Sequence, residues 1–150
     1  MPDGFVRGGP RLLLRIEGAG LLLGAVWAYA ALGQPWWIFL ALFFAPDLSL
    51  LGYAAGPRLG AGLYNALHTL VGPLIGLGLA AGLRETGLAG VALIWSAHIG
   101  LDRMLGYGLK YGTGFGDTHL GAIGRRRADA GTPGAVPAAG TGPACERPET

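Results

Sequence analysis

Long apolar stretches with few charges dominate the chain between Leu12 and Met104. A helix needs about 20 mostly apolar residues to cross about 30 Å of hydrocarbon. Four segments approach or reach that length: Leu12–Leu32, Trp36–Ala55, Ala61–Leu83 and Gly87–Met104. None shows the period-2 alternation of a barrel strand, and lipid offers backbone amides no partner outside helices and closed barrels. The pattern therefore predicts an all-α integral membrane protein, a four-helix arrangement with four transmembrane spans.

Small residues and prolines inside these segments predict how the helices pack. Glycines four residues apart let membrane helices approach closely, and the chain has three such pairs: Gly20/Gly24, Gly72/Gly76 and Gly78/Gly82. We expect them to support tight packing within the chain, and they do not by themselves indicate dimerisation. Pro46 and Pro73 are expected to kink their helices, because each removes a backbone donor and clashes one turn back.

The composition changes near the C-terminus. Residues 124–150 are rich in Pro, Gly, Ala and Thr and have no apolar period, which predicts a disordered tail. We therefore expect an N-terminal cytoplasmic segment (1–11), a membrane domain (12–123) and this tail (124–150). The membrane domain ends in a Gly-rich loop, 106–121, that is expected at the membrane interface. Asp117 and His119 in that loop are expected to be solvated.

The overall composition narrows the class of protein. Of 150 residues, 51% are hydrophobic and only 13% are charged, against roughly a quarter charged in soluble domains. This excludes a disordered chain, a coiled coil and a typical nucleic-acid module. The net charge of +2 does not suggest a polyanion partner, so the lipid bilayer is the expected partner and nucleic acid is not. The single Cys145 rules out an internal disulfide and a CxxC metal site.

Positive charges near the spans predict the orientation. An N-terminus in the cytoplasm leaves only Arg84 outside and puts most other basic residues inside: Arg7, Arg11, Arg58, Lys110 and Arg125–Arg127. We therefore expect both termini in the cytoplasm. A cleaved signal peptide is the alternative for the first segment, with Ala28–Ala30 as an A-x-A-like site. Glu17 at its polar border and the apolar length from Leu12 argue against cleavage.

Ionisable residues inside the spans gather at one depth. At a rise of 1.5 Å per residue, four of them lie roughly 8 to 12 Å below the cytoplasmic surface: Glu17, Asp47, His68 and His98. Asp102 and Arg103 lie one turn shallower on the same side. Charges at this depth are costly unless they are paired, hydrated or ligated, so they are candidates for function.

Helical spacing places several of these side chains on shared faces. His98 and Asp102 are i and i+4, and Asn65, His68 and Thr69 share another face. Together with Asp47 they can converge between the helices. Two imidazoles and two carboxylates suit a divalent Zn, Mn or Fe ion with an open coordination position. The predicted ligands are Asp47, His68, His98 and Asp102, with Glu17 as a candidate general base and Asn65, Thr69 and Arg103 as a supporting polar layer.

Three functions remain open at this point. The first is a structural or interaction role, in which the carboxylates pair with Arg103 and the histidines bond Asn65, Thr69 or backbone. The second is a metal-dependent hydrolase that acts on a lipid or headgroup ester at the cytoplasmic leaflet. The third is a small transporter, for which four spans require a homo-oligomer. The absence of GxxxxGK[ST], GxSxG and HExxH motifs disfavours a phosphate cradle, a serine nucleophile and the familiar zinc-protease helix.

Two long motifs carry a family resemblance. They are APDLSLLGYAAGPRLGAGLYNALHT (45–69) and AHIGLDRMLGYGLKYGTGFGDTHLG (97–121), with Arg15-Ile-Glu17-Gly18 as a shorter third match. They resemble the hallmark blocks of an uncharacterised bacterial membrane family, domain of unknown function 4260 (DUF4260), over about residues 11–123. The chain departs from the family pattern at Gly112 and Gly116, where a proline and a basic residue are more usual. The resemblance implies a small multi-span membrane protein and brings no established activity.

A fainter likeness involves the polar positions alone. Pro46-Asp47, Asn65-Ala-Leu-His68-Thr69 and His98-Ile-Gly-Leu-Asp102 are similar to elements of the membrane-bound metal-dependent hydrolases. That likeness implies a metal site at these positions. The first two elements contain fewer His and Asp residues here than in those proteins, so the likeness implies an incomplete ligand set.

Overall fold

The computed structural model describes residues 6, 8–112 and 116–122, and almost all of their regular structure is helical. The helices are α1 (Gly9–Ala31), α2 (Trp36–Phe43), the 3-10 helix η1 (Ala45–Ala55), α3 (Pro57–Leu67), α4 (Val71–Leu83) and α5 (Thr86–Leu105). Two short antiparallel strands follow, β1 (Asp117–Thr118) and β2 (Gly121–Ala122). The predicted all-α class is confirmed, with this small hairpin as an addition. The predicted tail lies outside the described residues.

The described part of the chain contains four segments long and apolar enough to cross a membrane. They are Gly9–Ala31, Trp36–Ala55, Pro57–Leu83 and Thr86–Leu105, within a few residues of the predicted spans. Large apolar side chains on several of them point outward, and Leu23, Trp27, Trp37, Leu40 and Leu51 are each at least 69% exposed. Such a surface is costly in water and suits contact with lipid.

The second and third segments are interrupted, and each interruption lies close to a proline. The second changes from α2 to η1 at Phe44, with Pro46 in the first turn of η1. The third is interrupted at residues 68–70, between α3 and α4, and Pro73 lies in the first turn of α4. Proline has no N–H, and its ring clashes with the carbonyl four residues back in a helix. For Pro73 that carbonyl belongs to Thr69. The kinks predicted at both prolines therefore take the form of helix breaks.

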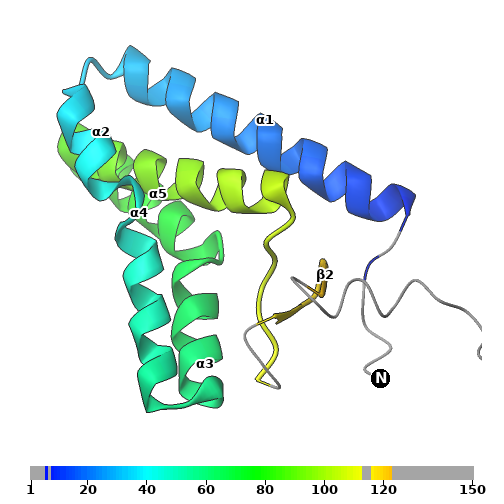
Figure 1. Cartoon of the computed structure of the whole chain (residues 1–150). Coiled ribbons are helices and arrows are strands. Elements are labelled where there is room, and N and C mark those ends of the chain that lie inside the picture. Colours follow the sequence, from blue (N-terminus) through cyan, green and yellow to red (C-terminus); the bar gives the residue numbers. More distant parts are fainter. Residues whose placement is uncertain (1–5, 7, 113–115, 123–150) are drawn as a thin grey trace, which may run out of the picture.

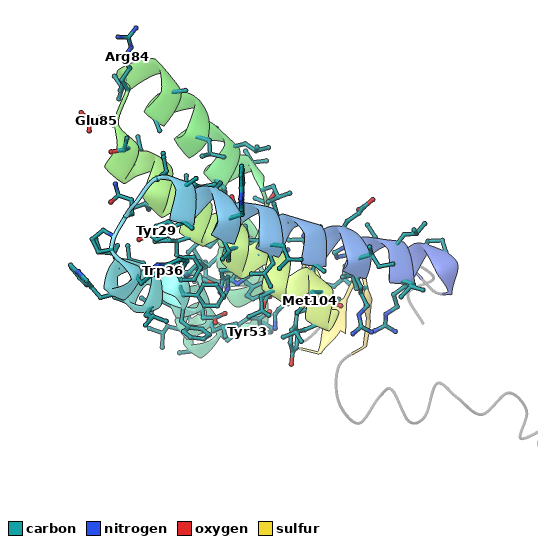
Figure 2. All side chains as sticks on the ribbon, turned by 90° about the horizontal axis from the view of Figure 1, so that it is seen from above. Tyr29, Trp36, Tyr53, Arg84, Glu85 and Met104 are labelled. Atoms are coloured by element: carbon teal, nitrogen blue, oxygen red, sulfur yellow. The ribbon has the colours of Figure 1, made fainter. Side chains whose placement is uncertain are left out.

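The helices form two groups (Figure 1). α1 and α5 lie side by side, and α4 packs against α5. η1 and α3 form an antiparallel pair that runs across the direction of α1 and α5. Gly56, with φ 124°, forms the turn between them, a conformation that side chains rarely adopt. Seen from above, the turn at Arg84 and Glu85 lies at one end of the α4–α5 pair, and Met104 lies near the other end of α5 (Figure 2).

Two glycines bring α1 and α5 into backbone contact. A Cβ atom on Gly18 would lie 2.6 Å from the Met104 backbone nitrogen, and one on Gly100 would lie 2.6 Å from the Leu22 backbone nitrogen. Arg15 Nε also donates to the Met104 carbonyl at 2.8 Å, which ties the same helix ends together. Close approach of the two longest helices therefore depends on side chains being absent at these two positions.

The predicted glycine pairs are used unequally. Gly72 and Gly76 pack α4 on α5, against Trp95 and Ala92 respectively. The remaining two pairs have open space where a Cβ would be: Gly20/Gly24 and Gly78/Gly82. The expected tight packing is thus present, but only one of the three GxxxG pairs contributes to it within the described residues.

Gly100→Ala is expected to push α1 and α5 apart and to lower the free energy of unfolding by about 1–3 kcal/mol, the usual cost of overpacking. Unfolding in mixed micelles by titration with dodecyl sulfate measures this change. Gly20→Ala is the matched control, because no atom lies within 4 Å of its added methyl group. Equal destabilisation by the two substitutions would show that the close approach at Gly100 does not matter.

Candidate metal centre

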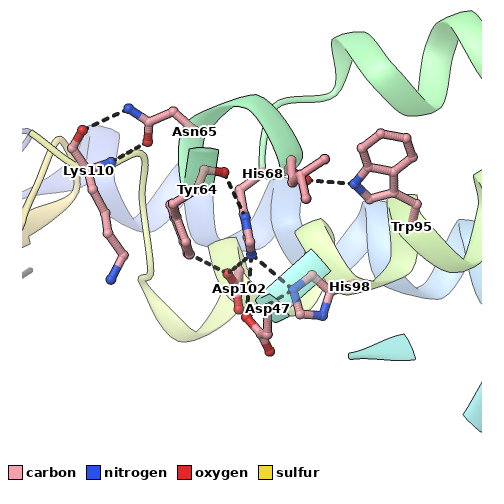
Figure 3. A network of polar contacts seen from close by, with 9 residues as sticks. Asp47, Tyr64, Asn65, His68, Trp95, His98, Asp102 and Lys110 are labelled. Atoms are coloured by element: carbon pink, nitrogen blue, oxygen red, sulfur yellow. Dashed lines mark hydrogen bonds and ion pairs between the residues drawn. The ribbon is translucent and has the colours of Figure 1, made fainter. Parts of the chain in front are cut away.

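A cluster of polar side chains lies where the two interrupted segments meet α5 (Figure 3). Asp47 is in the first turn of η1, and His68 caps the C-terminus of α3. His98 and Asp102 lie one turn apart on the continuous helix α5. Each helix break allows its segment to change direction, so side chains from three elements reach one point.

The nitrogen and oxygen atoms of the cluster lie at distances typical of ligands around one metal ion. His68 Nε2 is 3.2 Å from His98 Nε2 and 3.5 Å from Asp47 Oδ1. His98 Nε2 is 3.6 Å from the same Asp47 oxygen. Zinc–nitrogen bonds of about 2.0–2.1 Å in a tetrahedron place neighbouring ligand atoms about 3.3–3.4 Å apart. The three distances therefore fit one face of a tetrahedral site.

The tautomer of His68 follows from its second ring nitrogen. Nδ1 is 2.9 Å from the Tyr64 carbonyl oxygen, which can only accept, so the Nδ1–H donates. A neutral His68 therefore presents a lone pair on Nε2 to the cluster. The Tyr64 ring stacks on the imidazole at 3.7 Å between centroids and an interplanar angle of 11°, which fixes its plane. A backbone acceptor on the other nitrogen is the usual support of a metal-binding histidine.

His98 is held by packing. Its side chain is 2% exposed, and the Phe43 ring meets it edge-on at 5.5 Å. Its Nδ1 atom is buried and has no hydrogen-bond partner among the described residues. Leaving a buried nitrogen unpaired costs free energy. The polar contacts of His98 in the described part of the chain are made by Nε2, on the side of the cluster.

Asp102 lies beside the three-residue set. One ligand atom from each of Asp47, His68 and His98 lies within 4.8 Å of the others, and Asp102 is not part of that set. Its Oδ2 atom is 3.6 Å from His68 Nε2 and accepts a hydrogen bond of 2.8 Å from the Tyr64 hydroxyl. The structure thus brings the four predicted ligands together, with Asp102 more peripheral than the other three.

The other predicted site residues are not part of this cluster. Glu17 is exposed on α1, and in the described part of the chain it makes no ion pair with Arg103. Nor does Arg103 pair with Asp47 there, so the arginine pairing expected for a structural layer is not what holds these carboxylates. Thr69 lies in the break after α3.

Asn65 has a different partner from the histidines. Its side chain donates to the Lys110 carbonyl at 2.8 Å and accepts from the Lys110 N–H at 2.7 Å. These two hydrogen bonds hold the loop after α5 against α3. Lys110 is buried, and its Nζ lies 4.6 Å from the centre of the Tyr64 ring, within cation–π range. Burial lowers the pKa of Lys110, and the negative charges of Asp102 and Asp47 oppose this shift.

Tyr64 and Lys110 were not predicted as site residues. Tyr64 precedes His68 by four residues, so helical spacing places both on one face and is a usable signal. Lys110 offers no such signal, because its position depends on the tertiary bonds to Asn65.

His119, expected to be solvated, is partly exposed and also bonds to the loop after α5. The Leu109 N–H donates to His119 Nδ1 at 2.9 Å, and the His119 N–H donates to the Leu109 carbonyl at 3.1 Å. Burial lowers the pKa of His119, and the charge of Arg103 adds to this shift. His119 therefore attaches the β1–β2 hairpin to the loop that carries Lys110.

The fold and the cluster define a small helical protein with four membrane-length segments and a His–Asp centre where two of them are interrupted. The chain belongs to the family described as Domain of unknown function (DUF4260), whose model matches residues 11–123. The family predicted from the two long motifs is thus confirmed. No curated protein and no solved structure matched the chain. The first motif contains Asp47 and His68 and the second contains His98 and Asp102, so the matched region includes the whole cluster.

Asn65→Ala is expected to release the loop around Lys110, because both backbone groups of Lys110 lose their partner. The two hydrogen bonds contribute about 1–2 kcal/mol. Tryptic cleavage after Lys110 in detergent-solubilised protein should therefore accelerate roughly 5- to 30-fold. Cleavage after the exposed Arg84, in the turn between α4 and α5, is the internal control and should not change. Asn65→Asp keeps only the acceptor and should give an intermediate rate. Unchanged cleavage after Lys110 in Asn65→Ala would contradict this role.

Acid is expected to detach the hairpin. The pKa of His119 is lowered from its ordinary value of 6.5, so the folded chain favours the neutral ring. The stabilisation is therefore complete above pH 6.5 and is lost as the pH falls through the lowered pKa. Hydrogen-exchange protection of the Leu109 amide, corrected for intrinsic rates, should drop in this range. His119→Asn keeps an acceptor that does not titrate, and the same drop in that variant would exclude His119 as the cause.

Proposed function

We propose that this chain is an integral membrane protein that binds one divalent ion of the Zn, Mn or Fe type through Asp47, His68 and His98. We further propose that it hydrolyses an ester of a lipid or lipid headgroup. One observation carries the proposal: three ligand atoms from three different elements converge at 3.2, 3.5 and 3.6 Å. A metal ion requires its ligand atoms to surround one point, whereas polar side chains that only bridge helices do not require this arrangement.

The ligand types support an ion with open coordination. Two imidazoles with one carboxylate suit zinc and its neighbours in the first transition row. Three protein ligands with a free fourth position are typical of catalytic sites, whereas structural zinc sites are closed. The Asp47 side chain is 37% exposed while His68 is 3% exposed, so the cluster is accessible on the carboxylate side. An ion bound there would polarise an ester carbonyl and make water more acidic.

Asp102 is the residue that we assign to proton transfer. In the hydrolysis, water adds to the ester carbonyl carbon and the bond from that carbon to the alcohol oxygen breaks. Asp102 accepts the proton of the water and delivers it to the leaving oxygen, giving one acid and one alcohol. The Tyr64 hydroxyl holds Asp102 Oδ2 at 2.8 Å and so orients the carboxylate. Asp102 takes this role in place of Glu17, which is exposed on α1.

The distribution of basic residues supports the cytoplasmic side as the place of reaction. With both termini in the cytoplasm, Arg11, Arg58 and Lys110 lie on that side and Arg84 lies on the other, as the positive-inside rule favours. The cluster then lies in the cytoplasmic half of the membrane, and the substrate comes from the cytoplasmic leaflet.

A structural polar layer is the second candidate, favoured by the bonds that close the cluster without an ion. His68 and His98 share one hydrogen bond of 3.2 Å, and Tyr64 bonds Asp102. Such bonds between membrane helices contribute about 0.6–2 kcal/mol each. This function requires no bound metal, and removal of His98 then affects stability alone.

Metal analysis of protein purified in detergent without chelators separates the two functions. We expect about one equivalent of a transition metal per chain. The double variant His68→Ala/His98→Ala should fall below about 0.2 equivalents, because two of three ligands are lost. His119→Ala is the matched control, since this histidine lies outside the cluster, and it should retain the ion. Less than about 0.2 equivalents in the unaltered protein would support the structural layer instead.

A further inference from the structure

An apolar pocket of about 200 Å³ lies next to the candidate metal centre. Four elements line it, and three of them, η1, α3 and α5, also carry or adjoin the centre. Leu42 comes from α2, Ala45 and Pro46 from η1, Leu67 from α3, and Val91, Ile94 and Trp95 from α5. Pro46 directly precedes Asp47, and Leu67 directly precedes His68. On η1 and at the end of α3, a residue that lines the pocket is therefore bonded directly to a residue of the centre.

One face of α5 connects the pocket to the centre. Val91, Ile94, Trp95 and His98 stand at positions i, i+3, i+4 and i+7 of α5, which form one face of a helix. This face enters the pocket at Val91 and reaches the cluster at His98, with Asp102 one turn further. A molecule that lay along this face would have its apolar end in the pocket and its other end near the nitrogen and oxygen atoms of the cluster.

Trp95 gives the pocket a fixed, apolar wall. Its Nε1–H donates to the Leu67 carbonyl at 2.6 Å, so the polar edge of the indole is occupied. Gly72 of α4 lies directly against the same ring, where even one added carbon would collide. The ring is therefore held from two sides and turns no free donor toward the pocket.

The rim of the pocket is open to the apolar exterior of the protein. Val91 is 43% exposed and Leu67 is 36% exposed. Both lie within segments long and apolar enough to cross a membrane, so the rim faces lipid if these segments do cross. A hydrocarbon chain can then enter sideways without first crossing water.

We propose that this pocket holds one alkyl or acyl chain of an amphiphilic substrate while the polar group of that substrate meets Asp47, His68 and His98. The inference rests on the proposed metal centre and specifies its substrate class. An apolar cavity of about 150 Å³ accommodates benzene, whereas sites for drug-sized molecules begin at about 300 Å³. A pocket of about 200 Å³ therefore fits part of one chain and excludes a polar headgroup.

Alkyl hydroxamic acids test this inference, because their head binds metal ions and their tail length can be varied. Binding of the acetyl and octanoyl compounds to metal-loaded protein is measured by calorimetry in one detergent. Each methylene group that enters the pocket is worth about 0.8 kcal/mol, or roughly a fourfold gain in affinity. We expect the octanoyl compound to bind at least about 100-fold more tightly than the acetyl compound.

Two matched substitutions separate the pocket from general partition into detergent. Val91→Trp obstructs the rim and should weaken octanoyl binding about tenfold or more, leaving acetyl binding and metal content unchanged. Val71→Trp is the control, because Val71 is exposed on α4 and does not line the pocket. It should leave both affinities unchanged.

Three results would overturn the inference. Equal affinity for both compounds, or equal effects of Val91→Trp and Val71→Trp, would refute the chain pocket while leaving the metal centre intact. Protein that holds no metal and binds neither compound would refute the proposed function, and the pocket's role would fail with it.

Discussion

A helix that breaks inside an apolar segment exposes backbone carbonyls that lipid cannot satisfy, and this constraint shapes the structure. The break after α3 is the clearest case. There the Leu67 carbonyl accepts from Trp95 Nε1, and the Tyr64 carbonyl accepts from both the backbone N–H and the Nδ1–H of His68. The groups that compensate for the break are therefore the groups that build the site. Trp95 becomes the pocket wall, and His68 is fixed with Nε2 toward the cluster.

The sequence predicted the features that depend on local chemistry. Apolar length alone identified the four segments, since crossing hydrocarbon requires a run of residues that needs no tertiary information. The prolines located the breaks for the same reason. Depth in the membrane and helical spacing selected Asp47, His68, His98 and Asp102, and the structure places these four side chains together. Depth was informative because few ionisable residues occur inside the spans at all.

Features that depend on the rotation of a helix about its axis were not predictable. Glu17 was selected by its predicted depth, but α1 contacts α5 through the adjacent Gly18, where an added Cβ would meet the Met104 backbone. Successive residues of a helix point about 100° apart, so Glu17 is turned outward. Lys110 was missed for a related reason: its place beside Tyr64 is set by two bonds to Asn65, 45 residues earlier in the chain. Neither the outward rotation of Glu17 nor the position of Lys110 corresponds to a pattern in the sequence.

The charges around the cluster bear on the proposed metal centre. Two carboxylate oxygens, from Asp47 and Asp102, lie 3.5 and 3.6 Å from the same nitrogen of His68. In the part of the chain that the structure describes, Arg103 forms an ion pair with neither carboxylate. The ammonium group of Lys110 lies over the ring of Tyr64, 4.6 Å from its centre, and its charge also interacts with Asp102 and Asp47. One divalent ion among the convergent atoms would neutralise both carboxylates and use the lone pairs of both Nε2 atoms. A layer that only joined helices would be more stable with apolar residues or a complete ion pair at these positions.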